Sequence, residues 1–134
     1  MRFVVERGHV LAFSRALGKV DAGADVVSPT FAATTVVQDP DHMRGMRPAG
    51  ALAAAERLGG TVLHAEQRFE YLAPLCVGDV LEATQRSGRT WTKPRASGGE
   101  LLFTELVTEL RDSQDELVVR STMVLVRTDA GGQA

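Results

Sequence analysis

The sequence contains little cysteine, few aromatic residues and no long hydrophobic run. Its 134 residues include one cysteine, Cys76, which excludes an internal disulfide and a metal site built from several cysteines. A single cysteine also fits a reducing compartment, and we expect a cytoplasmic protein. The first residues have no apolar segment of the kind found in signal peptides, and no stretch approaches the roughly 20 apolar residues of a membrane helix. These absences predict a soluble protein that does not contact membranes.

The chain also lacks a strong excess of charge of either sign. Its formal net charge is −2, which gives no bulk attraction to nucleic acid or to an anionic surface. Hydrophobic residues make up 44% and charged residues 24%, as in ordinary globular proteins. This length suits a single domain, which we expect over residues 1–128. The small, polar tail over residues 129–134 is expected to be disordered.

The first half of the sequence predicts helices. Phe3–Val5 favours a short strand, and Gly8–Leu17 favours a helix, because its apolar residues recur at helical spacing before Gly18. An alanine-rich second helix is expected over residues 48–58. The segment Pro29–Val37 is ambiguous, because its threonines and valines favour a strand whereas its proline suits the first turn of a buried helix.

The second half changes to the period of two that is typical of strands. Thr61–Tyr71 alternates strictly, which predicts one largely apolar and one polar face. Further strands are predicted over Val80–Arg86, Leu101–Arg111 and Leu117–Arg127, the last of them inside the sheet because both of its faces are apolar at its end. Helices followed by an antiparallel meander predict an α+β domain with helical material on one face of the sheet.

Three local motifs occur along the chain. They are Val27–Phe31 (VSPTF), His64–Tyr71 (HAEQRFEY) and Pro74–Val80, in which Pro-Leu precedes Gly-Asp-Val. Together they resemble the N-terminal MaoC-like, fatty-acid-synthase-type dehydratase domain family. That family includes the substrate-binding subunit of heterodimeric mycobacterial-type hydroxyacyl carrier-protein dehydratases. The likeness covers the chain from about Phe3 to Arg127.

The resemblance implies a hot-dog fold, in which an antiparallel sheet wraps around a central helix. It also implies a homo- or heterodimer of two hot-dog subunits that bind a thioester of coenzyme A or acyl carrier protein at their seam, in fatty acid or polyketide metabolism. The implied reaction is the reversible hydration of a trans-2-enoyl thioester, which needs no cofactor. A carboxylate and a histidine activate the water, and a backbone N–H at a helix start polarises the thioester carbonyl.

The catalytic pair of the active superfamily members is absent from this sequence. Those members place Asp and His five residues apart just after the first helix, but no aspartate here stands five residues before a histidine. Lys19 occupies the position of the acid, directly after Gly18, and the histidine is missing. The resemblance therefore implies a non-catalytic, substrate-binding subunit of an (R)-3-hydroxyacyl thioester dehydratase or enoyl thioester hydratase. A MaoC-like partner would supply the Asp–His pair.

Two other functions stay open. One is a homo-oligomeric acyl-CoA thioesterase, in which Glu56 on the predicted second helix or Glu66 on the long strand positions water. The strict alternation places His64 and Glu66 on one strand face, where a carboxylate–imidazole pair would perform acid–base chemistry; the alternative is a solvated or subunit-facing surface. The other function is a non-enzymatic binder of acyl thioesters. For the dehydratase mechanism itself we expect no catalytic residue in this chain.

Two segments are candidates for substrate binding. The first is Pro29, Thr30 and Phe31, where the free N–H groups of a starting helix would hold the thioester carbonyl; capping or core packing is the alternative. The second is a cationic segment that its glycines predict to be a loop. It suits coenzyme A phosphates or the acidic face of a carrier protein, and a solvated hairpin tip is the alternative. Its cations are Arg86, Arg89, Lys93 and Arg95.

We expect no metal site. Asp39, Asp41 and His42 lie together, but no second cluster of ligands follows nearby. In the alternative interpretation this loop borders the mouth of the tunnel for the acyl chain that the resemblance implies. Cys76 has no histidine or asparagine candidate beside it in the sequence, so a structural role is favoured over that of a nucleophile.

Overall fold

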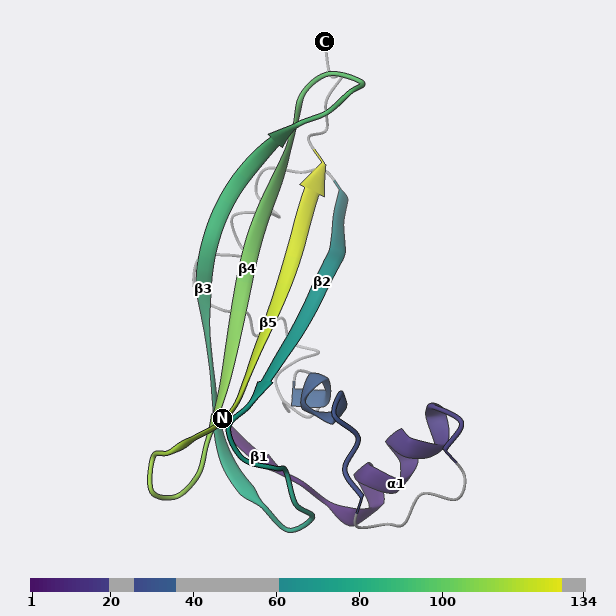
Figure 1. Ribbon diagram of the computed structural model, residues 1–134, viewed down its shortest axis with the longest axis vertical. Coiled ribbons are helices and arrows are strands. Elements are labelled where there is room, and N and C mark those ends of the chain that lie inside the picture. Colours follow the sequence, from purple (N-terminus) through teal and green to yellow (C-terminus); the bar gives the residue numbers. More distant parts are fainter. Residues whose placement is uncertain (20–25, 36–60, 129–134) are drawn as a thin grey trace.

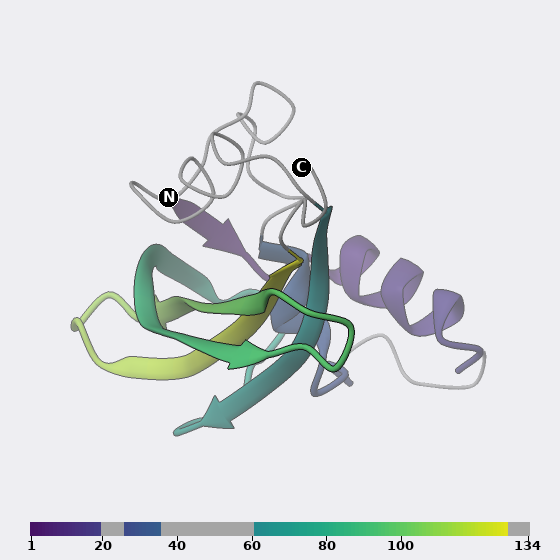
Figure 2. The ribbon, with the colours of Figure 1, turned by 90° about the horizontal axis from the view of Figure 1, so that it is seen from above.

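The chain forms one curved antiparallel sheet with helical segments to one side. The computed structural model describes residues 1–19, 26–35 and 61–128. In these ranges the strand order is β1-β3-β4-β5-β2. Figure 1 shows four long strands side by side, and Figure 2, seen from above, shows that the sheet curls. The elements are β1 (Arg2–Val4), α1 (Arg7–Ala16), η1 (Phe31–Thr34), β2 (Thr61–Tyr71), β3 (Val80–Pro94), β4 (Glu100–Arg111) and β5 (Leu117–Thr128).

Most of the predicted elements are confirmed. The strand and helix at the start of the chain agree with β1 and α1 to within a residue or so, and β5 lies between β4 and β2 inside the sheet as expected. The helix predicted over residues 48–58, the cluster of Asp39, Asp41 and His42, and the tail over residues 129–134 lie outside the described residues.

Gly18 ends α1 for a physical reason. Its φ of 78° lies in the left-handed region, which glycine adopts without a steric penalty. The N–H of Gly18 donates to the carbonyl of Arg15, and the N–H of Lys19 donates to the carbonyl of Ser14, both at 2.9 Å. This pair of bonds is a Schellman motif, which satisfies the last carbonyls of the helix and turns the chain away from its axis.

Where it is described, the ambiguous segment is helical rather than a strand, with Thr35 in α-helical conformation after a 3₁₀ turn. It folds into the single 3₁₀ turn η1, in which Phe31 donates its N–H to the carbonyl of Ser28. Phe31 is 1% exposed, and its ring lies 6.1 Å from Phe3 and 5.6 Å from Phe13 between the centroids. Burial of this aromatic ring, rather than local propensity, fixes the turn against β1 and α1.

β2 corrects the prediction that His64 and Glu66 share one face. The register shifts between these residues, so that His64 pairs with Leu125 whereas Glu66 pairs with Val124. Leu125 and Val124 are consecutive residues of β5 and therefore point to opposite faces of the sheet. Because paired residues share a face, His64 and Glu66 point to opposite faces as well. Ala65 is the extra residue of a β-bulge, which moves the alternation by one position and divides the predicted apolar face.

β3 corrects the prediction of a cationic loop after Arg86. The strand continues to Pro94, so Arg86, Arg89 and Lys93 lie on a strand, and the turn that contains Arg95 follows it. A bulge between Ser87 and Thr90 lets the strand pass its glycine without ending. The glycines predict a loop here, but the bulge accommodates Gly88 within the strand, and Arg86 and Arg89 pair with carboxylates of β4.

The two faces of the sheet differ in chemistry. The core face carries Leu106, Leu110 and Val119, and part of it packs against β1, α1 and η1 through Phe3 and Phe31. The opposite face, here called the charged face, carries carboxylates with arginines from neighbouring strands. Its ion pairs are Glu105 with Arg68 and Arg89, Glu109 with Arg86, Arg111 and Arg120, and Glu70 with Arg120.

Glu105 is the most enclosed of the ion-paired residues on the charged face. Its side chain is 8% exposed, and its Oε1 accepts from Arg68 Nη2 at 3.0 Å and from Arg89 Nη2 at 3.1 Å. The backbone N–H of Arg89 donates to Oε2 at 3.0 Å. Gly88 provides the space for this carboxylate, since a Cβ at Gly88 would lie 2.8 Å from Glu105 Oε2 and 2.9 Å from Glu105 Cβ.

The close approach at Gly88 predicts an effect on stability. We expect Gly88→Ala to lower the free energy of unfolding by about 1–3 kcal/mol, because the new methyl displaces the Glu105 side chain. Gly8→Ala is the matched control: a Cβ there has no atom within 4 Å, and alanine in α1 is expected to stabilise by about 0.5–1 kcal/mol. Urea denaturation measures both changes, and equal values for the two variants would contradict the packing argument.

The ion pairs of Glu105 predict acid sensitivity. The side-chain and backbone donors of Arg89 lower the pKa of Glu105 from 4.5 to about 2. A depressed folded-state pKa contributes stability that is complete above the unfolded pKa and is lost as the pH falls towards 2. We expect Glu105→Gln to cost about 1–3 kcal/mol at neutral pH and progressively less below pH 4.5. Denaturation of both proteins across this range measures the difference, and Glu116→Gln in the exposed β4–β5 turn is the control.

Candidate functional site

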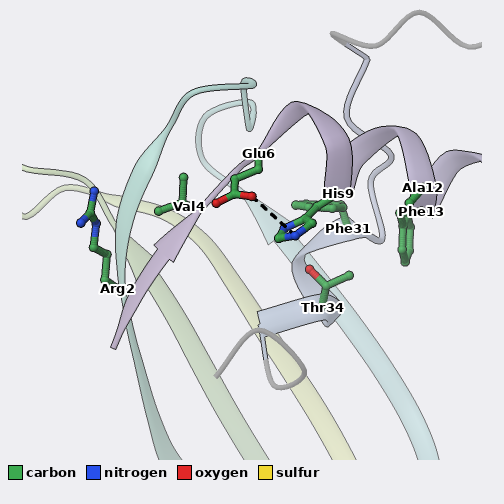
Figure 3. A pocket seen from close by; sticks show the side chains of 8 residues that line it. All are labelled: Arg2, Val4, Glu6, His9, Ala12, Phe13, Phe31 and Thr34. Atoms are coloured by element: carbon green, nitrogen blue, oxygen red, sulfur yellow. Dashed lines mark ion pairs between the residues drawn. The ribbon is translucent and has the colours of Figure 1, made fainter. Parts of the chain in front are cut away.

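Two pockets flank the segment that leads into η1. The first, shown in Figure 3, has a volume of about 470 Å³ and lies between β1, α1 and η1. The rings of Phe13 and Phe31 meet edge to face on its apolar side, and Glu6 Oε2 lies 3.5 Å from His9 Nε2 at its rim. Its lining residues are Arg2, Val4, Glu6, His9, Ala12, Phe13, Phe31 and Thr34.

The second pocket lies between the segment before η1 and the loop after β2, and its volume is about 400 Å³. The hydroxyl of Tyr71 donates to the carbonyl of Pro29 and ties the two segments together. Burial raises the pKa of Tyr71, which keeps this hydroxyl protonated as a donor. The lining residues are Val27, Ser28, Pro29, Tyr71, Leu72, Ala73, Pro74 and Leu75.

The first predicted binding segment separates these pockets. Pro29 lines the second pocket, and Phe31 lines the first while it also belongs to the core. Thr30 is exposed between them, makes no capping bond to η1, and has its Oγ1 3.2 Å from Ser28 Oγ. Pro29 and Phe31 thus each line a pocket, and thioester binding at these three residues stays a prediction.

The predicted cations are distributed along β3 rather than gathered in one cradle. Arg86 and Arg89 pair with Glu109 and Glu105, and Arg89 also lies 5.2 Å from the centroid of the Trp91 ring. Lys93 lies 5.4 Å from the centroid of the Phe103 ring, which stacks on Trp91 at 5.3 Å. Thus two of the four cations already neutralise carboxylates of β4, while Lys93 and Arg95 lie near the β3–β4 turn.

The catalytic candidates do not form a carboxylate–imidazole pair. His64 Nε2 lies 3.0 Å from the backbone oxygen of Glu66, whose carboxylate lies 3.6 Å from Arg68 Nε. Glu56 lies outside the described residues. The pair that the structure does bring together is Glu6 and His9, which the sequence analysis missed. Their spacing of three at the start of a helix was the available signal.

Other positions have structural explanations. Lys19 is exposed directly after the helix-ending Gly18. Cys76 is an exposed free thiol whose backbone N–H donates to Asp79 Oδ2 at 2.8 Å within the turn before β3. Among the described residues no group of three His, Cys, Asp or Glu side chains is placed to hold a metal ion. In the same ranges no helix has the length and apolar character needed to cross a membrane.

Solved structures share this architecture. The chain matches the C-terminally truncated HadBC (3R-hydroxyacyl-ACP dehydratase) complex of Mycobacterium tuberculosis with a TM-score of 0.55 and 20% identity, over 94% of this chain and 90% of that one. The ChsH1–ChsH2 complex of the same organism gives 0.65 and 17%, over 95% and 80%. HtdX of M. tuberculosis gives 0.62 and 16%, over 99% of this chain but 50% of the HtdX chain. At these identities the likeness shows the fold alone, which is the hot-dog fold.

No curated protein sequence matches the chain. The family model described as "FAS1-like, dehydratase domain region" matches residues 1–121, which is most of the sequence. This match agrees with the resemblance carried by the three motifs. The chain therefore belongs to the FAS1-like dehydratase-region family.

Proposed function

We propose that the protein is the substrate-binding, non-catalytic subunit of an (R)-3-hydroxyacyl thioester dehydratase or enoyl thioester hydratase. A partner hot-dog subunit supplies the Asp–His pair. The observation that carries this proposal is the absence, from the whole sequence of a dehydratase-family chain, of any aspartate five residues before a histidine. Hydration of an enoyl thioester needs such a carboxylate and imidazole to position water and move a proton.

The geometry of the alternative pairs supports this assignment. His64 and Glu66 lie on opposite faces of β2, so they do not act on one substrate atom together. Glu6 and His9 are close, but their side chains are 56% and 53% exposed. Water therefore solvates both side chains, whereas hydration of an enoyl thioester needs the pair held against the substrate.

The sheet edge supports a partner subunit. Among the described residues, no strand pairs with the outer edge of β2. On this strand Val62 is 38% and Leu63 is 53% exposed, and an unpaired edge with exposed apolar residues is suited to pairing with another sheet. HadBC and ChsH1–ChsH2 are both named as complexes, which favours a hot-dog partner for this chain as well.

The two pockets support a role in holding the substrate. Volumes of about 400 and 470 Å³ lie within the range of small-molecule sites, and both linings are largely apolar. In this proposal they hold parts of an acyl thioester carried by coenzyme A or acyl carrier protein. The reaction needs no cofactor, because the proton and the water come from the solvent and from the partner's residues.

An enoyl-CoA hydration assay tests the division of labour. We expect the purified chain alone to hydrate trans-2-enoyl-CoA no faster than buffer, and its complex with an Asp–His-bearing MaoC-like partner to be active. Asp→Asn in the partner is expected to lower kcat by about a hundredfold or more. Lys19→Ala in this chain is expected to leave the activity of the complex within about twofold, because the exposed Lys19 does no chemistry. Rapid hydration by the chain alone would overturn the proposal.

Filling the second pocket tests its role. Ala73 is exposed and lines this pocket, so Ala73→Trp occupies the space without removing a core side chain. We expect the KM of the complex for the enoyl thioester to rise about tenfold, a loss of about 1.4 kcal/mol of binding, while the free energy of unfolding changes by less than about 0.5 kcal/mol. Ala96→Trp in the exposed β3–β4 turn is the matched control. An unchanged KM in Ala73→Trp would exclude this pocket from binding.

A further inference from the structure

Arg127 is the one arginine on strands β2 to β5 that has no acidic partner among the described residues. The other five, Arg68, Arg86, Arg89, Arg111 and Arg120, all form ion pairs with Glu105, Glu109 or Glu70. Arg127 Nε, by contrast, is buried and has no hydrogen-bond partner. A buried donor without a partner is uncommon and destabilising, so this group calls for an acceptor that is not part of the described chain.

The position of Arg127 in the sheet explains why no carboxylate of the charged face pairs with it. Arg127 pairs with Leu102 on β4 and with Val62 on β2. Leu102 lies on the same face as Leu106 and Leu110, each of which is 1% exposed, whereas Glu105 and Glu109 occupy the alternate positions. Arg127 is therefore a cation on the core face, and the carboxylates that neutralise the other five arginines lie on the far side of the sheet.

The surroundings of Arg127 are accessible and partly polar. Arg127 is the penultimate residue of β5, at the arrowhead end of the strand in Figure 1. The next residue of β5 on the same face is Leu125, which pairs with His64 of β2 on one side and with Thr104 of β4 on the other. Val62 is 38% exposed and His64 is exposed, so solvent reaches the β2 side of this end of the core face.

The chemistry of the guanidinium identifies the class of ligand. Its planar fork of donors matches the oxygens of a carboxylate or a phosphate, and its weak hydration suits partly buried anion contacts. We propose that Arg127 anchors an anionic oxygen group of the thioester ligand. In coenzyme A or carrier-protein thioesters this group is a phosphate of the carrier arm, and in a dicarboxylic acyl chain it is the terminal carboxylate. The identity of the ligand rests on the proposed function, whereas the anion site does not.

The distance along β5 is compatible with an elongated ligand. Tyr71, which lines the second pocket, pairs with Val119, and Arg127 follows eight residues later on the same strand. Eight residues of extended strand span roughly 26 Å. An anion held at Arg127 therefore lies at the opposite end of the core face from the pocket, as the two ends of an extended acyl-pantetheine thioester would.

The anion site is tested directly by NMR of the arginine Nε–Hε groups in the full chain. The Arg127 signal is assigned by its loss in Arg127→Met. We expect it to shift saturably on titration with pyrophosphate or glutarate, and not with sodium chloride of equal ionic strength. The Arg120 signal is the matched control, because this arginine already pairs with Glu109 and Glu70. Absence of a saturable shift at Arg127 would overturn the proposal.

Affinity measurements distinguish the two sources of the anion. Crotonyl-CoA carries phosphates, glutaconyl-pantetheine carries only a terminal carboxylate, and crotonyl-pantetheine carries neither. We expect Arg127→Met to weaken one of the first two by about ten- to hundredfold and to leave crotonyl-pantetheine unchanged. Arg127→Lys, which keeps the charge but not the fork, recovers part of the loss. Equal weakening of all three ligands would mean that Arg127 has only a structural role.

Two further outcomes separate this site from the proposed function and from subunit contacts. If pyrophosphate shifts the Arg127 signal but no thioester binds the chain or its complex, the proposed function fails and the anion site stands. If Arg127→Met instead changes the oligomeric state, and the wild-type signal does not respond to anions, then the acceptor is a carboxylate of another subunit and the ligand proposal is overturned.

Discussion

The enclosure of Glu105 by Arg68, Arg89 and the bulge at Gly88 is the constraint on which the sheet depends. It joins β2, β3 and β4 through side chains, although Arg68 and Glu105 belong to strands that β5 separates. The carboxylate is nearly buried, and burial of a charge is tolerated only with several donors placed around it. Here the bulge supplies both a backbone donor and the space for the carboxylate.

This arrangement gives the sheet its two different faces. The charged face is largely neutralised within itself, because Glu105, Glu109 and Glu70 pair with arginines from other strands of the sheet. In the proposals above, the ligand is bound by the core face and its ends. The Pro29–Phe31 segment separates two pockets at one end, and at the other end Arg127 has no carboxylate partner among the described residues.

The proposed function explains this division. In it, Lys19 follows Gly18 at the position where active members of the family carry the acid, and a partner subunit contributes the water-activating groups. The two pockets, and the outer edge of β2 with which no described strand pairs, then serve to bind substrate and partner.

The sequence by itself determined the order of elements, the ends of α1 and the interior position of β5, because these depend on local periodicity and on single residues such as Gly18. It also determined the family through its motifs, and the lack of an Asp–His pair through spacing alone. Only the tertiary structure decided that β3 continues through its cations and that Ala65 places His64 and Glu66 on opposite faces. It also showed that Arg127 Nε has no partner within the described part of the chain. The physical reason is that a bulge depends on the pairing of two strands, and an ion pair between strands depends on the side chains of both. The residues involved are far apart in the sequence, so local patterns do not reveal them.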